Sequence, residues 1–174
     1  AMALLHEAKG VDIDETIIIN GDGSITPSTA PIQQNGSIYT LTGDITTNTT
    51  AITIQKGDIT IDGADYTICG GGALTQTSGI SIDSIDHVTI KNMKIMNFSF
   101  GISLYSSSND AILGNNITNN WEGIYVYCSG HNTLIRNTAS CNYHDGVSIS
   151  YSSQHNSIYH NNFNNTYQAF DAGG

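Results

Sequence analysis

The chain has 174 residues, a formal net charge of −10 and only 11% charged residues, and its length is that of one domain. Five Lys plus Arg stand against fifteen Asp plus Glu, which argues against nucleic acid and anionic membrane surfaces as partners, because both are polyanions. No apolar run is long enough to span a bilayer, so membrane insertion is not expected.

The first 50 residues are irregular. Residues 1–10 are interpreted as a tag or lead-in. Short runs rich in β-branched and aromatic residues predict strands at Ile17–Ile19, Ser37–Leu41 and Asp44–Thr46. We therefore expect residues 11–50 to form a β cap over the N-terminal end of the structure that follows.

From residue 51 to residue 174, the chain repeats a unit of about 22 residues. The glycines Gly79, Gly101, Gly123 and Gly146 open successive units and are separated by 22, 22 and 23 residues. With the less regular units included, coils are expected to start near positions 51, 79, 101, 123, 146 and 169. A fixed period in this range is typical of a solenoid. The first coil is longer than the others because it contains a glycine-rich loop, Cys69–Ser78.

Aliphatic residues alternate with small polar residues after each opening glycine, which predicts a strand with one buried face. One position after the glycine, the inward ladder reads Ile52, Ile80, Ile102, Ile124, Val147 and Phe170. Three positions after it, the ladder reads Ile54, Ile82, Leu104, Val126 and Ile149. Further aliphatics recur later in each unit, and no helical stripe is present. The predicted fold is therefore all-β: a right-handed parallel β-helix with three strands per coil.

Asparagines follow the same period. Asn115, Asn137 and Asn161 are expected to stack at one bend of successive coils. Asn97, Asn119 and Asn165 are expected to stack at another, where Cys141 takes the place of asparagine in its coil as a small interior residue. Such ladders bond one coil to the next. Cys128 and Cys141 fall on different segments of one coil, and Cys69 is a coil or more away from both, so three free thiols are expected.

The stretch Thr40–Ile68, TLTGDITTNTTAITIQKGDITIDGADYTI, followed by the glycine-opened coils, resembles secreted β-helix proteins of the pectin-lyase-like superfamily. It is most similar to the NosD-type copper-binding and archaeal cell-surface branch. This resemblance implies an extracellular or cell-surface location and polysaccharide as the commonest partner class. It carries little information about chemistry, because the superfamily includes lyases, hydrolases, adhesins and spacers.

Aromatic residues at outward positions provide the main functional hypothesis. The set consists of Trp121, Tyr125, Tyr105, Tyr127 and Tyr143. Outward aromatic clusters bind the apolar faces of sugars or proteins, although cross-strand aromatic pairs also stabilise sheets. We expect an extracellular module that binds a polysaccharide or glycan, or a rigid surface scaffold. Because the chain stops just after a coil opens, end-to-end self-association is also expected.

An enzyme is the alternative hypothesis. Glu122 and Asp145 each stand directly before a coil-opening glycine, and successive coils are about 4.8 Å apart. Their carboxyl groups could therefore reach the separation that glycoside hydrolysis requires, with Asp83 in support. A lyase is less favoured because the acids and the base it needs are not grouped. The two acids are equally compatible with an ordinary pair of solvent-exposed loop residues that have no catalytic role.

A metal-binding periplasmic protein is the third hypothesis. If a metal ion binds, the ligands would be His144, Asp145 and Glu122. The sequence has no HxH or HxxxH pair, and His87 and His131 share a turn position but lie two coils apart, too far to bind one ion. No cofactor is expected, and Ca²⁺ is the one other ion that the acidic residues could bind.

Overall fold

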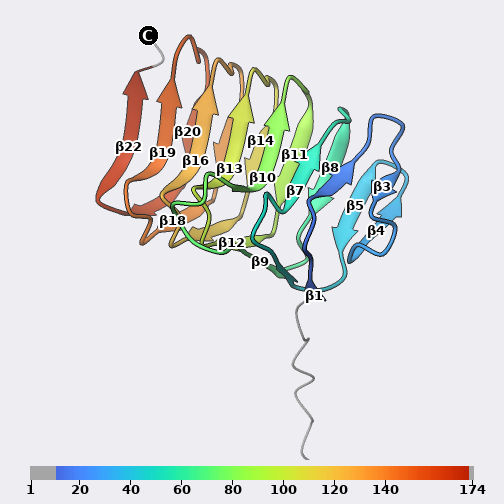
Figure 1. Cartoon of the computed structure of the whole chain (residues 1–174). Helices are drawn as coiled ribbons and strands as arrows, with labels where there is room; N and C mark the ends of the chain where they lie inside the picture. The colour runs from blue at the N-terminus through green and yellow to red at the C-terminus, as the bar shows by residue number, and fades with distance from the viewer. Residues whose placement is uncertain (1–10, 173–174) are drawn as a thin grey trace, which may run out of the picture.

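The computed structural model describes residues 11–172, which form a parallel β-solenoid in which each regular coil contributes one strand to each of three sheets (Figure 1). These residues contain no helix, and so none that could cross a membrane. The all-β solenoid predicted from the repeat is confirmed. The lead-in predicted for residues 1–10 lies outside the described residues.

The sheets are named A, B and C. Sheet A contains, in spatial order, β1 (Val11–Asp12), β6 (Ile45–Thr46), β9 (Thr67–Cys69), β12 (Lys94–Met96), β15 (Asn116–Thr118), β18 (Thr138–Ser140) and β21 (Asn162–Asn164). Sheet B contains β22 (Tyr167–Ala172), β19 (Asp145–Ser150), β16 (Glu122–Tyr127), β13 (Phe100–Tyr105), β10 (Ser78–Asp83), β7 (Ile52–Ile54), β2 (Ile17–Ile19) and β3 (Ile25–Thr26). Sheet C contains β20 (Ser157–Tyr159), β17 (Thr133–Ile135), β14 (Ala111–Leu113), β11 (Val88–Lys91), β8 (Ile59–Asp62), β5 (Ile38–Leu41) and β4 (Ile32–Asn35).

Two antiparallel hairpins interrupt the parallel pairing at the N-terminal end. Strand β3 pairs with β2, and β4 pairs with β5. The sequence predicted strands at β2, β5 and β6 but not at β3 or β4, whose short runs are rich in polar residues. The hairpins place β3 and β4 at the ends of sheets B and C, where the regular coils would otherwise present unpaired backbone.

The inward ladders form the core. In sheet B, Ile80, Ile102 and Ile124 are in register and fully buried. The ladder that contains Leu104 is also buried. Phe170 was wrongly placed in the first ladder: Val147 pairs with Ala169, so Phe170 pairs with Ser148 and is 52% exposed. The last repeat is one residue shorter than assumed, and a shift of one residue turns a side chain to the opposite face.

Buried asparagines join the coils at the bends. The Asn115 side chain accepts a hydrogen bond from the Met93 amide, and Asn137 accepts one from the Asn115 amide. Each asparagine also donates its side-chain NH₂ group to a backbone carbonyl of the preceding coil. For example, Asn137 donates to the Ile112 carbonyl over 2.8 Å. The predicted ladder of Asn115, Asn137 and Asn161 is therefore present.

The second asparagine ladder differs from the prediction by one residue. It consists of Asn120, Asn142 and Asn165. Asn97, Asn119 and Cys141 occupy the left-handed position just before it, with φ of 64°, 57° and 56°. Cys141 is consequently exposed rather than interior, because a residue in this conformation turns its side chain away from the core. All three cysteines have free thiols, as predicted.

A third ladder contains an aspartate where the others have asparagine. Asp110 accepts a hydrogen bond from the Val88 amide, and its own amide donates to Asn132. Asn132 also donates its side-chain amide to the Ser107 carbonyl, whereas the second carboxyl oxygen of Asp110 is buried without a partner. Burial, together with the nearby Asp86, raises the pKa of Asp110 to about 7. Below about pH 7, a neutral carboxyl group therefore takes the place of the amide.

Replacing Asp110 by Asn should stabilise the protein. Because the pKa of Asp110 is raised on folding, the wild-type protein loses stability as pH rises from about 4 to about 7 and stays at the lower level above that. Asp110→Asn should remove this part of the slope and raise the free energy of unfolding by about 1–3 kcal/mol at pH 8. Urea unfolding at pH 5 and pH 8 measures both effects. Equal pH slopes for the variant and the wild type would contradict the assignment.

Candidate metal centre and aromatic edge

Two acids open neighbouring strands of sheet B. Glu122 is the first residue of β16, and Asp145 is the first residue of β19, with which β16 pairs in parallel. His144 precedes β19, and its amide donates to the Trp121 carbonyl over 2.8 Å. The parallel stacking of coils therefore brings together side chains that are 22 and 23 residues apart in the sequence.

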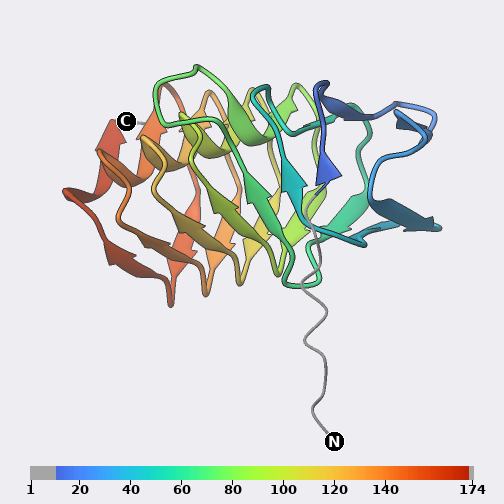
Figure 2. The ribbon, with the colours of Figure 1, turned by 60° about the horizontal axis from the view of Figure 1, so that its bottom comes forward.

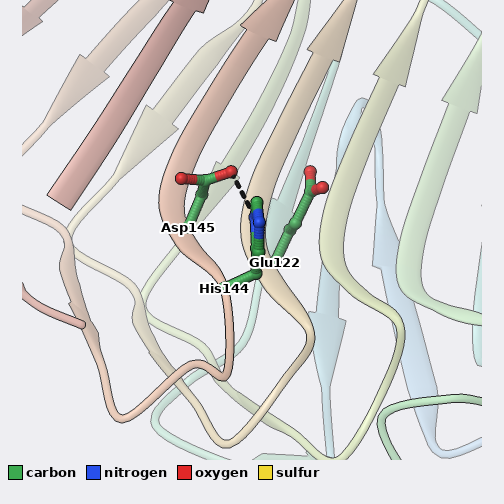
Figure 3. A group of neighbouring side chains, drawn as sticks. All are labelled: Glu122, His144 and Asp145. Carbon is green, nitrogen blue, oxygen red and sulfur yellow. Dashed lines mark hydrogen bonds and ion pairs between the residues drawn. The ribbon is translucent and has the colours of Figure 1, made fainter. Parts of the chain in front are cut away.

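The three side chains form a compact group. One ligand atom from each of Glu122, His144 and Asp145 lies within 4.8 Å of the other two. The Nδ1 atom of His144 lies 2.7 Å from Oδ2 of Asp145. Figure 3 shows the imidazole between the two carboxyl groups in this view. Asp145 is only 2% exposed, whereas the His144 side chain is 42% exposed and leaves the group open to solvent on that side.

Two oxygens of this group have no hydrogen-bond partner. They are Oδ1 of Asp145 and Oε2 of Glu122, and both are buried. A buried carboxylate oxygen that is left unpaired is costly, because the water that solvated it has been removed. Within the described residues, Asp110 has the only other such carboxyl oxygen. The arrangement favours a positive charge between the two carboxyl groups.

Burial raises the pKa of Glu122 above its ordinary value, and the neighbouring Asp145 raises it further. The proximity of His144 and a hydrogen bond with Ser148 act in the opposite direction. The net result is a carboxyl group that resists ionisation unless a cation compensates the charge.

The His144 ring is held between two aromatic rings. Trp121 stacks on it with ring centroids 5.4 Å apart and an angle of 13° between the planes. Tyr167, from the next coil, packs at 5.0 Å and 57°. Sequence reasoning did not identify Tyr167, although it follows His144 by 23 residues, the period that relates His144 to Trp121. Fixed ring orientation is a common property of histidines that bind metals.

The predicted aromatic residues divide into two groups. Tyr105 and Tyr127 stack face to face at 4.7 Å and 8°, and Tyr125 stacks on Phe100 at 4.9 Å. These stacked contacts cover part of the ring faces in this row. Trp121 and Tyr143 belong to a separate edge, where they are 39% and 61% exposed.

Trp121 and Tyr143 line a pocket of about 450 Å³. Its opposite wall is the glycine-rich loop between β9 and β10, with Gly71, Ala73 and Leu74 among the lining residues. Figure 2 shows this loop, drawn in green, crossing over the neighbouring coils. The excess length of the first coil was visible in the sequence, but the period alone could not show where the loop would fold.

Asp83 does not join the acidic group. It ends β10, whereas the residue of β10 in the Phe100 and Glu122 column is Ser78, at the opposite end of the strand. Its nearest polar partner is the Ser84 hydroxyl. The structure therefore brings together Glu122, His144 and Asp145 but leaves Asp83 apart.

A family model described as "Periplasmic copper-binding protein (NosD)" matches residues 4–174. The chain belongs to the NosD family. No curated protein and no solved structure is significantly similar to it. The resemblance to the NosD-type branch, noted for Thr40–Ile68 and the coils that follow, is thus confirmed.

The donors at this NosD-family site fit one oxidation state of copper better than the other. Cu⁺ prefers thiolate and thioether ligands, whereas imidazole and carboxylate groups suit divalent ions. Across residues 11–172, the Glu122, His144 and Asp145 group is the only cluster of three His, Cys, Asp or Glu side chains close enough to share an ion. Its one nitrogen and two carboxylates fit Cu²⁺ or a similar divalent cation, and no cysteine contributes.

Removal of one acid should stabilise the metal-free protein. Because the pKa of Glu122 is raised on folding, wild-type stability falls as pH rises from about 4.5 through that raised value. In Glu122→Gln this loss is absent, so the variant should be more stable than the wild type at pH 7.5, and its advantage should be smaller at pH 5. Thermal unfolding in chelator at pH 5 and pH 7.5 measures the difference. A variant that is less stable at both pH values would show that the charged group stabilises the fold.

Proposed function

We propose that this NosD-family protein is exported and binds a divalent transition-metal ion, foremost Cu²⁺, at Glu122, His144 and Asp145. The observation that carries the proposal is the pair of buried, unpartnered carboxyl oxygens on two neighbouring coils. A cation held by the two carboxyl groups would compensate their buried negative charge, and the imidazole offers a nitrogen ligand in the same group. The family description supports both copper and a location outside the cytoplasm.

Chemistry favours Cu²⁺ over other divalent ions. For a given set of nitrogen and oxygen ligands, Cu²⁺ binds more tightly than Zn²⁺ and Mn²⁺. Ca²⁺ prefers six to eight oxygen ligands, which two carboxylates do not supply without several waters. The residues of the chain have distinct roles: Asp145 and Glu122 provide negative charge, and His144 is oriented by Trp121 and Tyr167.

The only tryptophan of the chain can report on occupancy. Trp121 stacks on His144, so Cu²⁺ bound there should quench its fluorescence, whereas Zn²⁺ should not. We expect quenching to saturate at one equivalent of Cu²⁺. Electron paramagnetic resonance should show coupling to a single imidazole nitrogen.

Matched variants separate ligation from packing. His144→Phe keeps a ring between Trp121 and Tyr167 but removes the nitrogen ligand, and Asp145→Asn removes a charge. Each should weaken Cu²⁺ binding by about tenfold or more, since each loses one ligand. Asp83→Asn, which removes an exposed acid of the same sheet, should bind normally. Unchanged Cu²⁺ affinity in both site variants would rule out this site.

Glycan binding is the second candidate function, and the pocket beside Trp121 and Tyr143 favours it. The apolar faces of sugars pack on exposed aromatic rings, and the glycine-rich loop offers backbone groups for hydroxyls. The carboxyl pair would also suit a retaining hydrolase, for which about 5–5.5 Å between carboxyl groups is typical. The candidate activities therefore occupy adjoining parts of one edge.

A glycan array on the metal-free protein tests this second function. Trp121→Ala should abolish binding to any glycan recognised, and Leu74→Ser should weaken it, because both side chains line the pocket. Tyr151→Ala removes an exposed ring of the separate tyrosine row and should have no effect. Binding without release of reducing ends would favour a binding module, and release would favour the enzyme. Absence of any glycan bound by the wild type would exclude this second function.

A further inference from the structure

A notch lies at the bend between sheets C and A, on a different bend from the metal centre. At this bend, Asn92, Gly114, Arg136 and His160 occupy the same left-handed position in successive coils, with φ of 53°, 64°, 55° and 57°. Gly114 has no side chain in this column. A Cβ atom added there would have Asn92 Oδ1, at 3.7 Å, as its nearest neighbour, so the space is open.

The notch has a volume of about 320 Å³ and combines apolar and cationic walls. Leu113 and Ile135 are in register on neighbouring strands and form an apolar floor. Lys91 and Arg136 stand on either side of Gly114. They are two of only four lysines and arginines in residues 11–172, in a chain whose net charge is −10.

Only one of the two cations is uncompensated. The Lys91 ammonium lies 3.1 Å from a carboxyl oxygen of Asp62, and Asn92 donates to the same carboxyl group. Arg136 is exposed and has no hydrogen bond or ion pair with any described residue. The guanidinium group is therefore available to a ligand and carries one unbalanced positive charge.

We propose that this notch binds a small organic monocarboxylate with an apolar body. A planar guanidinium group matches a carboxylate by two parallel hydrogen bonds, and the single charge is balanced by a monoanion. The aliphatic floor would cover the rest of the ligand. A phosphate dianion fits less well, because the amides of Asn92 and Gly114 already donate to carbonyls of the next coil and cannot solvate a second charge.

The notch is specific to one coil. Asparagine fills the column on one side of Gly114, and arginine followed by histidine fills it on the other. The glycine is not required by the backbone, because asparagine adopts the same conformation in the preceding coil. What glycine provides here is the space beside Arg136.

Titration with benzoate, followed by nuclear magnetic resonance of amide and arginine side-chain signals, tests the proposal. Benzoate should shift the Gly114 amide and the Arg136 Nε–H signal in a saturable way, and the uncharged benzyl alcohol should not. Arg136→Gln should lower benzoate affinity about tenfold or more, since a charge-assisted pair is lost. Gly114→Asn should abolish binding by filling the notch while keeping the left-handed backbone.

Two controls make the result specific. Lys56→Gln removes one cation elsewhere and should leave the affinity unchanged, as should Glu122→Gln in the metal centre. Equal shifts with benzyl alcohol, or unchanged benzoate affinity in Arg136→Gln, would overturn the proposal. Sulfate that binds as tightly as benzoate would overturn the assignment to a carboxylate.

Discussion

The structure depends on hydrogen bonds that each coil makes to the next through buried amides. Asn137 illustrates the constraint: its oxygen accepts from the Asn115 amide, and its nitrogen donates to the Ile112 carbonyl. No coil could bury these groups by itself, because their partners belong to the neighbouring coil. Any shift in register would leave buried donors and acceptors unpaired along the whole bend. The register of the solenoid is therefore strict.

Strict register turns sequence spacing into spatial position. Residues one period apart lie in one column on neighbouring coils, which explains the stacked Tyr105 and Tyr127 and the adjacent acids Glu122 and Asp145. The candidate sites occur where a column departs from its usual residue type. Gly114 opens a gap in a column of larger side chains, and Tyr143 belongs to a turn that is one residue longer than the turn of the preceding coil.

The period was sufficient to predict the strands of the regular coils, most of the buried ladders and the proximity of Glu122 to Asp145. It failed where one residue was inserted or lost, as with Phe170 and the second asparagine ladder, because every later residue then changes face or column. The path of the loop that contains Leu74 depends on its contacts rather than on the repeat. The unpaired oxygens of Glu122 and Asp145 were likewise unpredictable, since hydrogen-bond satisfaction depends on the exact positions of surrounding groups.

Asp110 and the acids of the metal centre differ in what would satisfy their buried carboxyl groups. Asp110 is surrounded by the amides of a ladder, and a single added proton makes it equivalent to the asparagines beside it. At Glu122 and Asp145, two carboxyl groups and an imidazole converge, and both acids have an oxygen without a partner. One proton would neutralise only one of the two acids, whereas a divalent cation would contact both. Neutral side chains at these two positions would be less costly to bury than two acids, and Asn120 and Asn142 are an example at the adjacent bend. The pair of acids is therefore better explained by cation binding than by folding.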